Sequence, residues 1–319
     1  MRQSVAVVAL ALALVVRAAG ALQTGDYTRA IEVGGRRRTY LVHVPPGTSA
    51  APLPIVIALH GGLSNGAGMA RFSGLSDKAD RSGFIAVYPN GTGRLPRALT
   101  WNAGNCCGYA ESHHIDDVAF IRAMLDDLGA ATPVDARRIY ATGISNGGMM
   151  AYRLAAELAE RIAAIAPVSG PMGTEGCHPS RPVSVLHFHG TADPFAPFAG
   201  GRGARSLPSI NFYSVEHSLR AWIAADGCPA EPLVTGLPAR VDDGTQVTRK
   251  TYGPCREGAE VVLLMIENGG HTWPGRQPPV RFLGKATANV DANDAMWDFF
   301  VKHPLPATGA VRAHPAGER

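Results

Sequence analysis

The sequence lacks the short motifs that hold metals and nucleotides. It contains no C-x-x-C or H-E-x-x-H pair, no G-x-G-x-x-G loop and no glycine-rich loop ending in Gly-Lys-Ser or Gly-Lys-Thr. We therefore expect neither a metal nor another cofactor. Long runs of one charge are also missing, since no stretch of Lys and Arg exceeds Arg36–Arg38 and the net charge is only +4 over 319 residues. This diffuse excess is typical of an ordinary protein surface and disfavours nucleic-acid binding.

Apolar runs long enough to span a bilayer are absent after the N-terminus. The first residues have the pattern of a secretory signal, with a positive start at Met1-Arg2, an almost wholly apolar run from Ser4 to Val16, and small residues at Ala19–Ala21. We expect residues 1–21 to be cleaved off; an uncleaved anchor is the alternative. The apolar run is short for a span. We therefore expect no stable membrane insertion and a location in the periplasm or outside the cell.

All the cysteines follow the predicted signal, and in an oxidising compartment they are disulfide candidates. There are five of them: Cys106, Cys107, Cys177, Cys228 and Cys255. Cys228 and Cys255 each lie beside a turn proline and flank a strand region, so we expect these two to pair. Cys177 is expected to join Cys107 or Cys106, which leaves one cysteine of the adjacent pair over.

Short apolar runs alternate with segments of helical periodicity after a leading hairpin. Residues 28–47 predict two strands around a Gly-Gly turn. Further strands are predicted within 52–62, 84–91, 137–143, 162–170, 183–190, 247–253 and 259–271. Helices are predicted within 75–83, 116–129, 147–161, 211–227 and 289–303.

This alternation predicts an α/β fold, with a mostly parallel sheet, helices on both faces and an antiparallel N-terminal hairpin. We expect a single catalytic domain over residues 22–304. Residues 305–319 are rich in Pro, Ala and Gly and are expected to be frayed. The sequence favours no particular oligomeric state.

The pattern G-x-S-x-G occurs twice, at Gly62–Gly66 and at Gly143–Gly147. A serine nucleophile needs a sharp turn between a strand and a helix, which holds its hydroxyl clear of the sheet. Ser145 has this setting, with a predicted strand before it and a predicted helix after it. Ser64 follows a strand, but the next residues are rich in Gly and predict no helix. We therefore predict Ser145 as the nucleophile and Ser64 as a loop hydroxyl; the alternative for Ser145 is a turn serine that caps the helix.

An acid and a histidine follow Ser145 in the order that such hydrolases need. Asp193 and His271 each stand just after a predicted strand, and ligands collect at the carboxyl ends of parallel strands. We predict that His271 is the general base and that Asp193 orients it. The backbone N–H groups of Gly62 and Asn146 are predicted to stabilise the oxyanion.

Other polar and aromatic residues have structural interpretations. Asp116 and Asp117 open a predicted helix, where carboxylates are favourable, and His187 with His189 fits a buried, hydrogen-bonded pair. Trp101 begins the stretch WNAGNCCG, and Trp273 lies two residues after His271. They are our candidates for stacking on an aryl or sugar group, with ordinary packing as the alternative.

Six stretches in this order resemble the exported α/β-hydrolase esterases known as polyhydroxybutyrate depolymerases and feruloyl esterases (carbohydrate esterase family 1-like). They are LHGG, WNAGNCCG, DDVAFI, VDARRIYATGISNGGMMAYRLA, HFHGTADPFAPF and GGHTWPG, spread over most of 54–300. The resemblance implies an α/β-hydrolase fold, a triad of Ser145, Asp193 and His271, no cofactor, and a carboxylic ester as substrate. The stretch PFAPF departs from the Val-Pro-Tyr-like run that such enzymes often show.

We expect hydrolysis of small or oligomeric hydroxyalkanoate esters, because a separate polymer-binding domain is not seen. Feruloyl or acetyl-xylan ester hydrolysis is the main alternative, with Tyr109 as a further aromatic candidate. From other classes, an acyltransferase or a non-catalytic binding protein could use the same fold.

Overall fold

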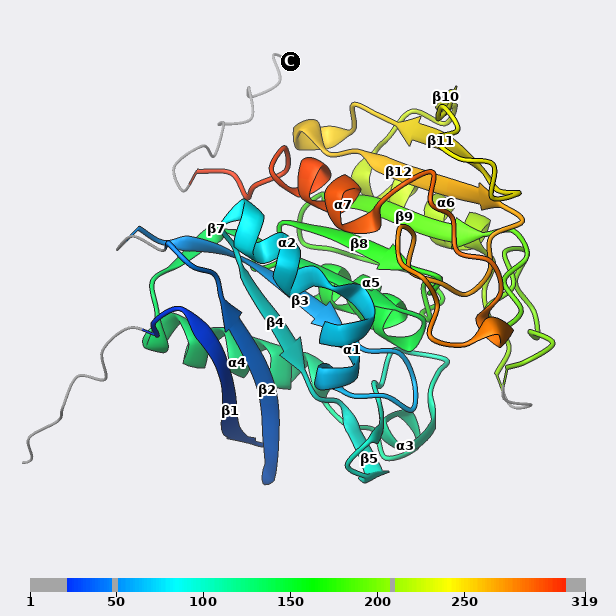
Figure 1. Ribbon diagram of the computed structural model, residues 1–319. Coiled ribbons are helices and arrows are strands. Elements are labelled where there is room, and N and C mark those ends of the chain that lie inside the picture. The colour runs from blue at the N-terminus through cyan, green and yellow to red at the C-terminus, as the bar shows by residue number, and fades with distance from the viewer. Residues whose placement is uncertain (1–21, 48–50, 207–209, 308–319) are drawn as a thin grey trace, which may run out of the picture.

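A ten-stranded sheet runs through the protein (Figure 1). The computed structural model describes residues 22–47, 51–206 and 210–307. The strands follow one another across the sheet in the order β1-β2-β4-β3-β7-β8-β9-β12-β11-β10. Their bounds are β1 Gly25–Val33, β2 Arg36–Val44, β3 Leu53–Leu59, β4 Ile85–Pro89, β7 Val134–Ile144, β8 Ala164–Val168, β9 Ser184–Gly190, β10 Leu233–Gly236, β11 Gln246–Tyr252 and β12 Val261–Glu267. The predicted signal and residues 308–319 of the predicted tail lie outside the described residues.

The N-terminal hairpin is confirmed. β1 and β2 pair antiparallel around Gly34 and Gly35, whose φ angles of 57° and 69° suit glycine in the tight turn of a two-residue hairpin. β2 then pairs antiparallel with β4. From β4 to β12 the neighbouring strands are parallel, and β11 and β10 return antiparallel at the far edge. The mostly parallel sheet of the prediction is therefore confirmed.

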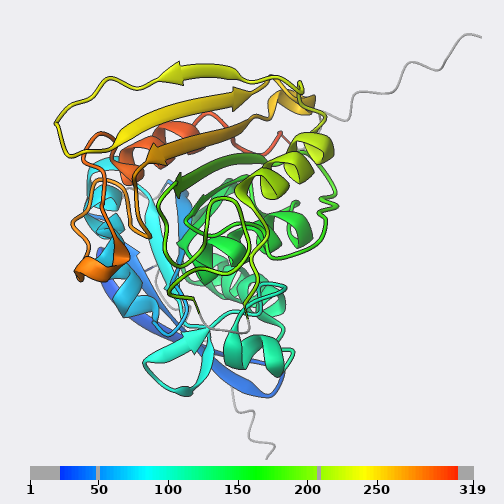
Figure 2. The ribbon, with the colours of Figure 1, turned by 90° about the vertical axis from the view of Figure 1, so that its right-hand side faces the viewer.

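Helices cover both faces of the sheet (Figures 1 and 2). Their bounds are α1 Gly66–Ser73, α2 Leu75–Ser82, α3 Gly108–Ser112, α4 Asp117–Ala131, α5 Asn146–Glu157, α6 Val215–Asp226 and α7 Ala292–Phe300. Alternate side chains of one strand enter two separate cores, because strand side chains alternate between faces. Ile55 and Ile57 of β3 pack in the core under α4, α5 and α6, whereas Val56 packs in the core under α1, α2 and α7.

Two expectations on secondary structure were wrong. Residues 66–73, which we expected to be non-helical, form α1, because Asn65 accepts a hydrogen bond from the N–H of Gly68 (2.8 Å) and Met69 is buried against the sheet. α4, which we expected to end at Gly129, continues to Ala131. The segment 90–112, for which we made no prediction, contains a small hairpin of β5 Thr92–Leu95 and β6 Ala98–Thr100, followed by α3.

One of the two expected disulfides is found. Cys228, just after α6, pairs with Cys255. The expected bridge from Cys177 is wrong, because the sulfurs of Cys106 and Cys107 are joined to each other. The Cys177 thiol is free and packs in the core under α4, α5 and α6, where burial raises its pKa to about 12.

Candidate active site

Ser145 lies on a sharp turn between β7 and α5. Its backbone angles, φ 56° and ψ −124°, are rare for a residue with a side chain and cost about 1–3 kcal/mol. A Cβ at Gly143 would lie 2.6 Å from the backbone of Gly147, and one at Gly147 only 2.2 Å from the carbonyl oxygen of Leu59. Glycine is therefore required on both sides of Ser145. The Ser145 side chain makes no capping hydrogen bond, so the helix-cap alternative loses its support.

Ser64 has a different setting, although a helix does follow it. α1 begins at Gly66, after the capping residue Asn65. Ser64 itself forms an isolated antiparallel bridge with Leu99. Its φ is not positive, unlike that of Ser145. The two serines are therefore distinguished by their backbones and not, as we expected, by the presence or absence of a helix.

Asp193 and His271 follow the neighbouring parallel strands β9 and β12, so their side chains meet at one edge of the sheet. The Nδ1 of His271 lies 2.8 Å from Oδ2 of Asp193, and both residues are buried. Oδ1 of Asp193 accepts the backbone N–H groups of Phe195 and Ala196 at 2.8 and 2.9 Å. A carboxylate only accepts, so the Nδ1 of His271 carries the hydrogen and its Nε2 is left as the basic nitrogen.

Burial by itself would raise the pKa of Asp193. The charge and hydrogen bond of His271, together with the Ala196 N–H, outweigh burial and lower this pKa below its ordinary value. The carboxylate therefore stays ionised beside the imidazole. It can stabilise a positive charge that forms on His271 when the ring takes up a proton.

Ser145 and His271 line the same pocket, which has a volume of about 1080 Å³. Gly62 and Asn146 line it too, and a Cβ at Gly62 would come within 3.8 Å of the Asn146 Cβ. Asn146 opens α5, where the first backbone N–H groups have no partner inside the helix. The two segments predicted to supply the oxyanion donors are thus in contact beside Ser145.

The burial of Trp101 and Trp273 favours ordinary packing, the alternative to stacking on a ligand. Their side chains are 0% and 1% exposed, and neither lines the pocket. The indole N–H of Trp273 donates to Oδ1 of Asn293 at 3.0 Å, in the core. Buried indoles use their one donor internally. Tyr109 does line the pocket.

Trp101 has a role that the sequence did not reveal. Its indole N–H donates to the carbonyl oxygen of His60 (2.9 Å), directly before Gly61 and Gly62. Its backbone N–H donates to Oδ1 of Asn146 (2.7 Å), and the Asn146 amide donates back to its carbonyl oxygen (3.0 Å). One buried residue thus holds both segments of the predicted oxyanion site. The only sequence signal for this role was that Trp101 begins the stretch WNAGN. This stretch does not show which atoms Trp101 contacts.

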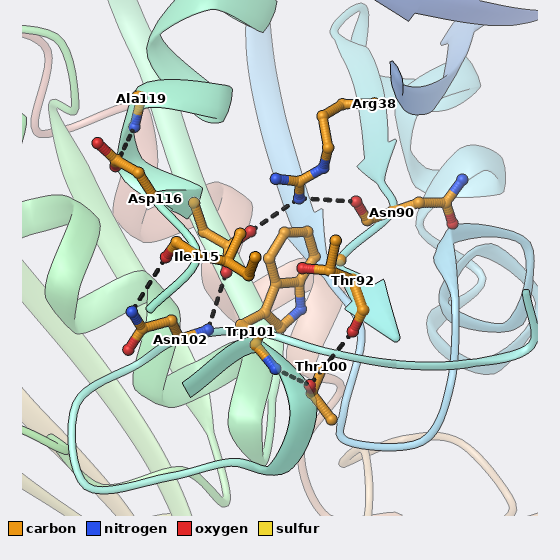
Figure 3. A network of polar contacts seen from close by, with 12 residues as sticks. Arg38, Asn90, Thr92, Thr100, Trp101, Asn102, Ile115, Asp116 and Ala119 are labelled. Atoms are coloured by element: carbon orange, nitrogen blue, oxygen red, sulfur yellow. Dashed lines mark hydrogen bonds and ion pairs between the residues drawn. The ribbon is translucent and has the colours of Figure 1, made fainter. Parts of the chain in front are cut away.

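A buried ion pair fixes the segment that carries Trp101 (Figure 3). Nη2 of Arg38, from β2, lies 2.7 Å from Oδ1 of Asp117, and Oδ2 of Asp117 accepts the backbone N–H of Asn102 at 2.8 Å. Asn102 also donates to the carbonyl oxygen of Ile115 (3.0 Å). Asp116 caps α4, as expected, and Asp117 additionally anchors the residue next to Trp101. Hydrogen bonds therefore connect β2 and α4 to the site.

Two sets of buried histidines order the loops. Nε2 of His60 accepts the N–H of Gly91 (3.0 Å) while its Nδ1 donates to the Gly61 carbonyl oxygen (2.8 Å), and burial lowers its pKa to about 4. His187 and His189 are hydrogen-bonded to each other at 2.9 Å, and Nε2 of His189 donates to the Ala196 carbonyl oxygen (2.8 Å). Burial lowers the pKa of all three, so these histidines are neutral positioning groups; His60 lines the pocket, whereas His187 and His189 do not.

Within the described ranges, no group of three or more His, Cys, Asp or Glu side chains is arranged to hold a metal ion. In the same part of the chain no helix has both the length and the apolar character that a membrane crossing requires.

The chain matches the family described as Esterase PHB depolymerase over residues 38–235. It belongs to this family. A protein named as an esterase, NocK of Nocardia uniformis subsp. tsuyamanensis, is 34% identical over 86% of this chain and 82% of its own length. Feruloyl esterase C of Emericella nidulans is 29% identical over 83% of the chain and 84% of its own length. Together with the site, this makes the protein a serine esterase of the α/β-hydrolase type.

A larger relative and a solved structure are similar to the chain as well. Feruloyl esterase B of Piromyces equi is 31% identical over 73% of this chain, but the chain spans only 42% of that protein. The acetyl xylan esterase of Aspergillus awamori has the same fold, with a TM-score of 0.55 over 86% of this esterase and 99% of that chain, at 15% identity. The predicted α/β-hydrolase fold is confirmed.

Proposed function

We propose that this esterase hydrolyses its substrate through an acyl-enzyme on Ser145. His271 takes the proton of the Ser145 hydroxyl as this oxygen attacks the ester carbonyl, and then gives a proton to the leaving alkoxide. Asp193 holds the imidazole and stabilises its positive charge. The backbone N–H groups of Gly62 and Asn146 donate to the oxyanion. Water then attacks the acyl group by the same steps in reverse.

One observation carries this proposal. The strained turn of Ser145 and the hydrogen-bonded pair of His271 and Asp193 come from three separate strand ends, and Ser145 and His271 line one pocket. The combination of φ 56° with ψ −124° is costly for a residue with a side chain, and backbone strain of this kind clusters at functional sites.

Labelling with a fluorophosphonate tests the nucleophile directly. The probe forms a covalent bond with an activated serine oxygen. We expect peptide mass spectrometry to find the label on Ser145 and not on Ser64, although both line the pocket. A label on Ser64 would overturn the assignment.

As substrate we propose hydroxyalkanoate esters or short oligomers. Membership of the PHB depolymerase family supports this chemistry. The pocket of about 1080 Å³ is large enough for an extended ligand, since sites for drug-sized molecules have about 300–1,000 Å³. Its walls include Phe72, Phe195 and Phe282, which suit an aliphatic chain.

Feruloyl or acetyl-xylan ester hydrolysis is the second candidate. The names of several relatives support it, and Tyr109 provides an aromatic wall for an aryl group. Rates on a linear 3-hydroxybutyrate trimer and on methyl ferulate, measured with the same preparation, decide between the two. Acyl transfer, a third reading, predicts that an added alcohol yields a new ester in preference to free acid.

We further propose that the protein is exported after cleavage at Ala21. The Cys228–Cys255 disulfide supports an oxidising compartment. N-terminal sequencing of protein recovered from the periplasm or the medium should begin at Leu22. Recovery of the intact chain from the membrane fraction would support the uncleaved anchor instead.

A further inference from the structure

The charges around the pocket are of one sign. Among the residues that the structure describes, its lining includes four arginines and no Asp or Glu; Asp193 lies behind His271 and does not line it. The four are Arg71, Arg94, Arg205 and Arg276. Among the described residues none of these four makes an ion pair with a carboxylate, whereas Arg29, Arg38, Arg122, Arg138, Arg153, Arg161, Arg220 and Arg249 do. Uncompensated positive charge is therefore gathered at the pocket.

Two of these arginines come from the loops that carry the proposed acid and base. Arg205 belongs to the segment after β9 that begins with Asp193, and Arg276 follows His271 by five residues. The guanidinium of Arg276 lies against Gly74, where a Cβ would come within 2.5 Å of its Cζ. Gly74 therefore leaves the room that this guanidinium occupies.

A line of aromatic rings connects Arg205 to the base. The ring of Phe195 is centred 5.0 Å from that of His271, Phe282 lies 6.1 Å from Phe195, and the Arg205 guanidinium lies 6.0 Å from the centre of the Phe282 ring. His271 gives its proton to the leaving alcohol in the proposed mechanism. The wall that runs from His271 to Arg205 therefore faces the alcohol portion of the ester.

We propose that this pocket selects esters that carry a carboxylate on their alcohol portion, and that Arg205 and Arg276 bind this carboxylate. The inference rests on the proposed function and narrows its substrate class. A single exposed ion pair contributes little, but charges of one sign around a pocket with apolar walls reinforce one another and concentrate anions. The free end of a hydroxyalkanoate oligomer is such a carboxylate, whereas a neutral polymer surface or a methyl ester offers none.

A matched pair of substrates isolates the charge. The linear 3-hydroxybutyrate trimer and its methyl ester contain the same internal ester bonds and differ in the carboxylate at the alcohol end. Because the methyl ester is itself a cleavable ester, the rates are those of internal-bond cleavage, followed by product analysis. At low ionic strength we expect kcat/KM to be about tenfold higher for the free acid. In 1 M NaCl, where the Debye length falls to about 3 Å, the ratio should approach one. A ratio of one or less at low salt would overturn the proposal.

Substitution of the arginines locates the effect. Arg205→Gln and Arg276→Gln should each lower the ratio of free acid to methyl ester by about three- to tenfold, and Arg205→Lys should lower it less. Arg81→Gln is the matched control, because Arg81 is exposed on α2 and lies outside the pocket lining. The ratio is independent of the fraction of folded enzyme. Equal ratios in the two pocket variants and the control would overturn the assignment of these residues.

Binding to Ser145→Ala separates this inference from the proposed reaction. If the wild type hydrolyses neither trimer, the proposed function fails, and calorimetry with the two intact trimers still tests the charge. Tighter binding of the free acid supports the arginine site, and equal binding contradicts it.

Discussion

The two G-x-S-x-G pentapeptides of this esterase have nearly the same sequence, GLSNG and GISNG, but we propose different roles for them. Both follow a strand, both precede a helix, and both serines line the pocket. In the second loop the serine itself has a strained backbone and the flanking glycines touch the backbone of Leu59 and of each other. In the first loop the helix starts two residues after Ser64, behind the cap Asn65. The position of the turn, not the motif, decides which hydroxyl is presented.

The largest expected difference between the loops is in catalysis. Ser145→Ala should reduce kcat on a p-nitrophenyl ester by about 10³-fold or more, because the variant lacks the proposed nucleophile. Ser64→Ala should stay within about threefold of the wild type. Circular dichroism checks that both variants are folded. Activity of Ser145→Ala close to that of the wild type would contradict the proposal that Ser145, and not Ser64, is the nucleophile.

The glycines should differ in stability. In Gly143→Ala the new Cβ would lie 2.6 Å from the Gly147 backbone, so we expect a loss of about 3 kcal/mol in the free energy of unfolding. Gly62→Ala places its Cβ 3.8 Å from the nearest atom, which is ordinary contact, and should cost less than about 1 kcal/mol. Urea denaturation measures both. Similar losses for the two variants would mean that the first loop is as tightly packed as the second.

Trp101 joins the two loops, so its loss should affect both at once. Trp101→Phe leaves the His60 carbonyl oxygen without its donor, and we expect kcat to fall about tenfold while KM changes little. Trp273→Phe removes a comparable buried hydrogen bond, 3.0 Å to Asn293, away from the loops. It should lose similar stability without a loss of kcat. A tenfold fall in both variants would assign the effect to general destabilisation.

The smallest expected effect is a pH dependence of the first loop. Burial lowers the pKa of His60 to about 4 from an ordinary value of 6.5. Between these two pH values His60 is protonated in the unfolded chain but neutral in the folded protein. Stability from this group is complete above pH 6.5 and is lost as the pH falls towards 4. Between pH 7 and pH 5.5 this loss is about 1 kcal/mol. We expect the difference in the free energy of unfolding between the wild type and His60→Gln, measured by urea denaturation, to decrease by that amount between pH 7 and pH 5.5. A constant difference would contradict the prediction.

Much of the fold could be predicted because its signals are local. The Gly-Gly turn, the apolar strands and the order of serine, acid and histidine are all readable along the chain. The sequence also predicted that Asp193 and His271 follow strands, which parallel pairing then brings together. The remaining features depend on contacts between distant residues. α1 needs the sheet under Met69, and the roles of Trp101 and Cys177 are set by burial, which their neighbours in sequence do not reveal.

The segment 90–112 has a consequence for engineering. Arg94, Leu95 and Tyr109 form part of the pocket wall. Between them along the chain, Trp101 is hydrogen-bonded to Asn146 and Asn102 to Asp117. Part of the pocket wall and part of the support of the proposed oxyanion site therefore lie in one short stretch of chain. A directed-evolution library that randomises Arg94, Leu95 and Tyr109 and keeps Trp101 and Asn102 should change the substrate preference without loss of the catalytic geometry.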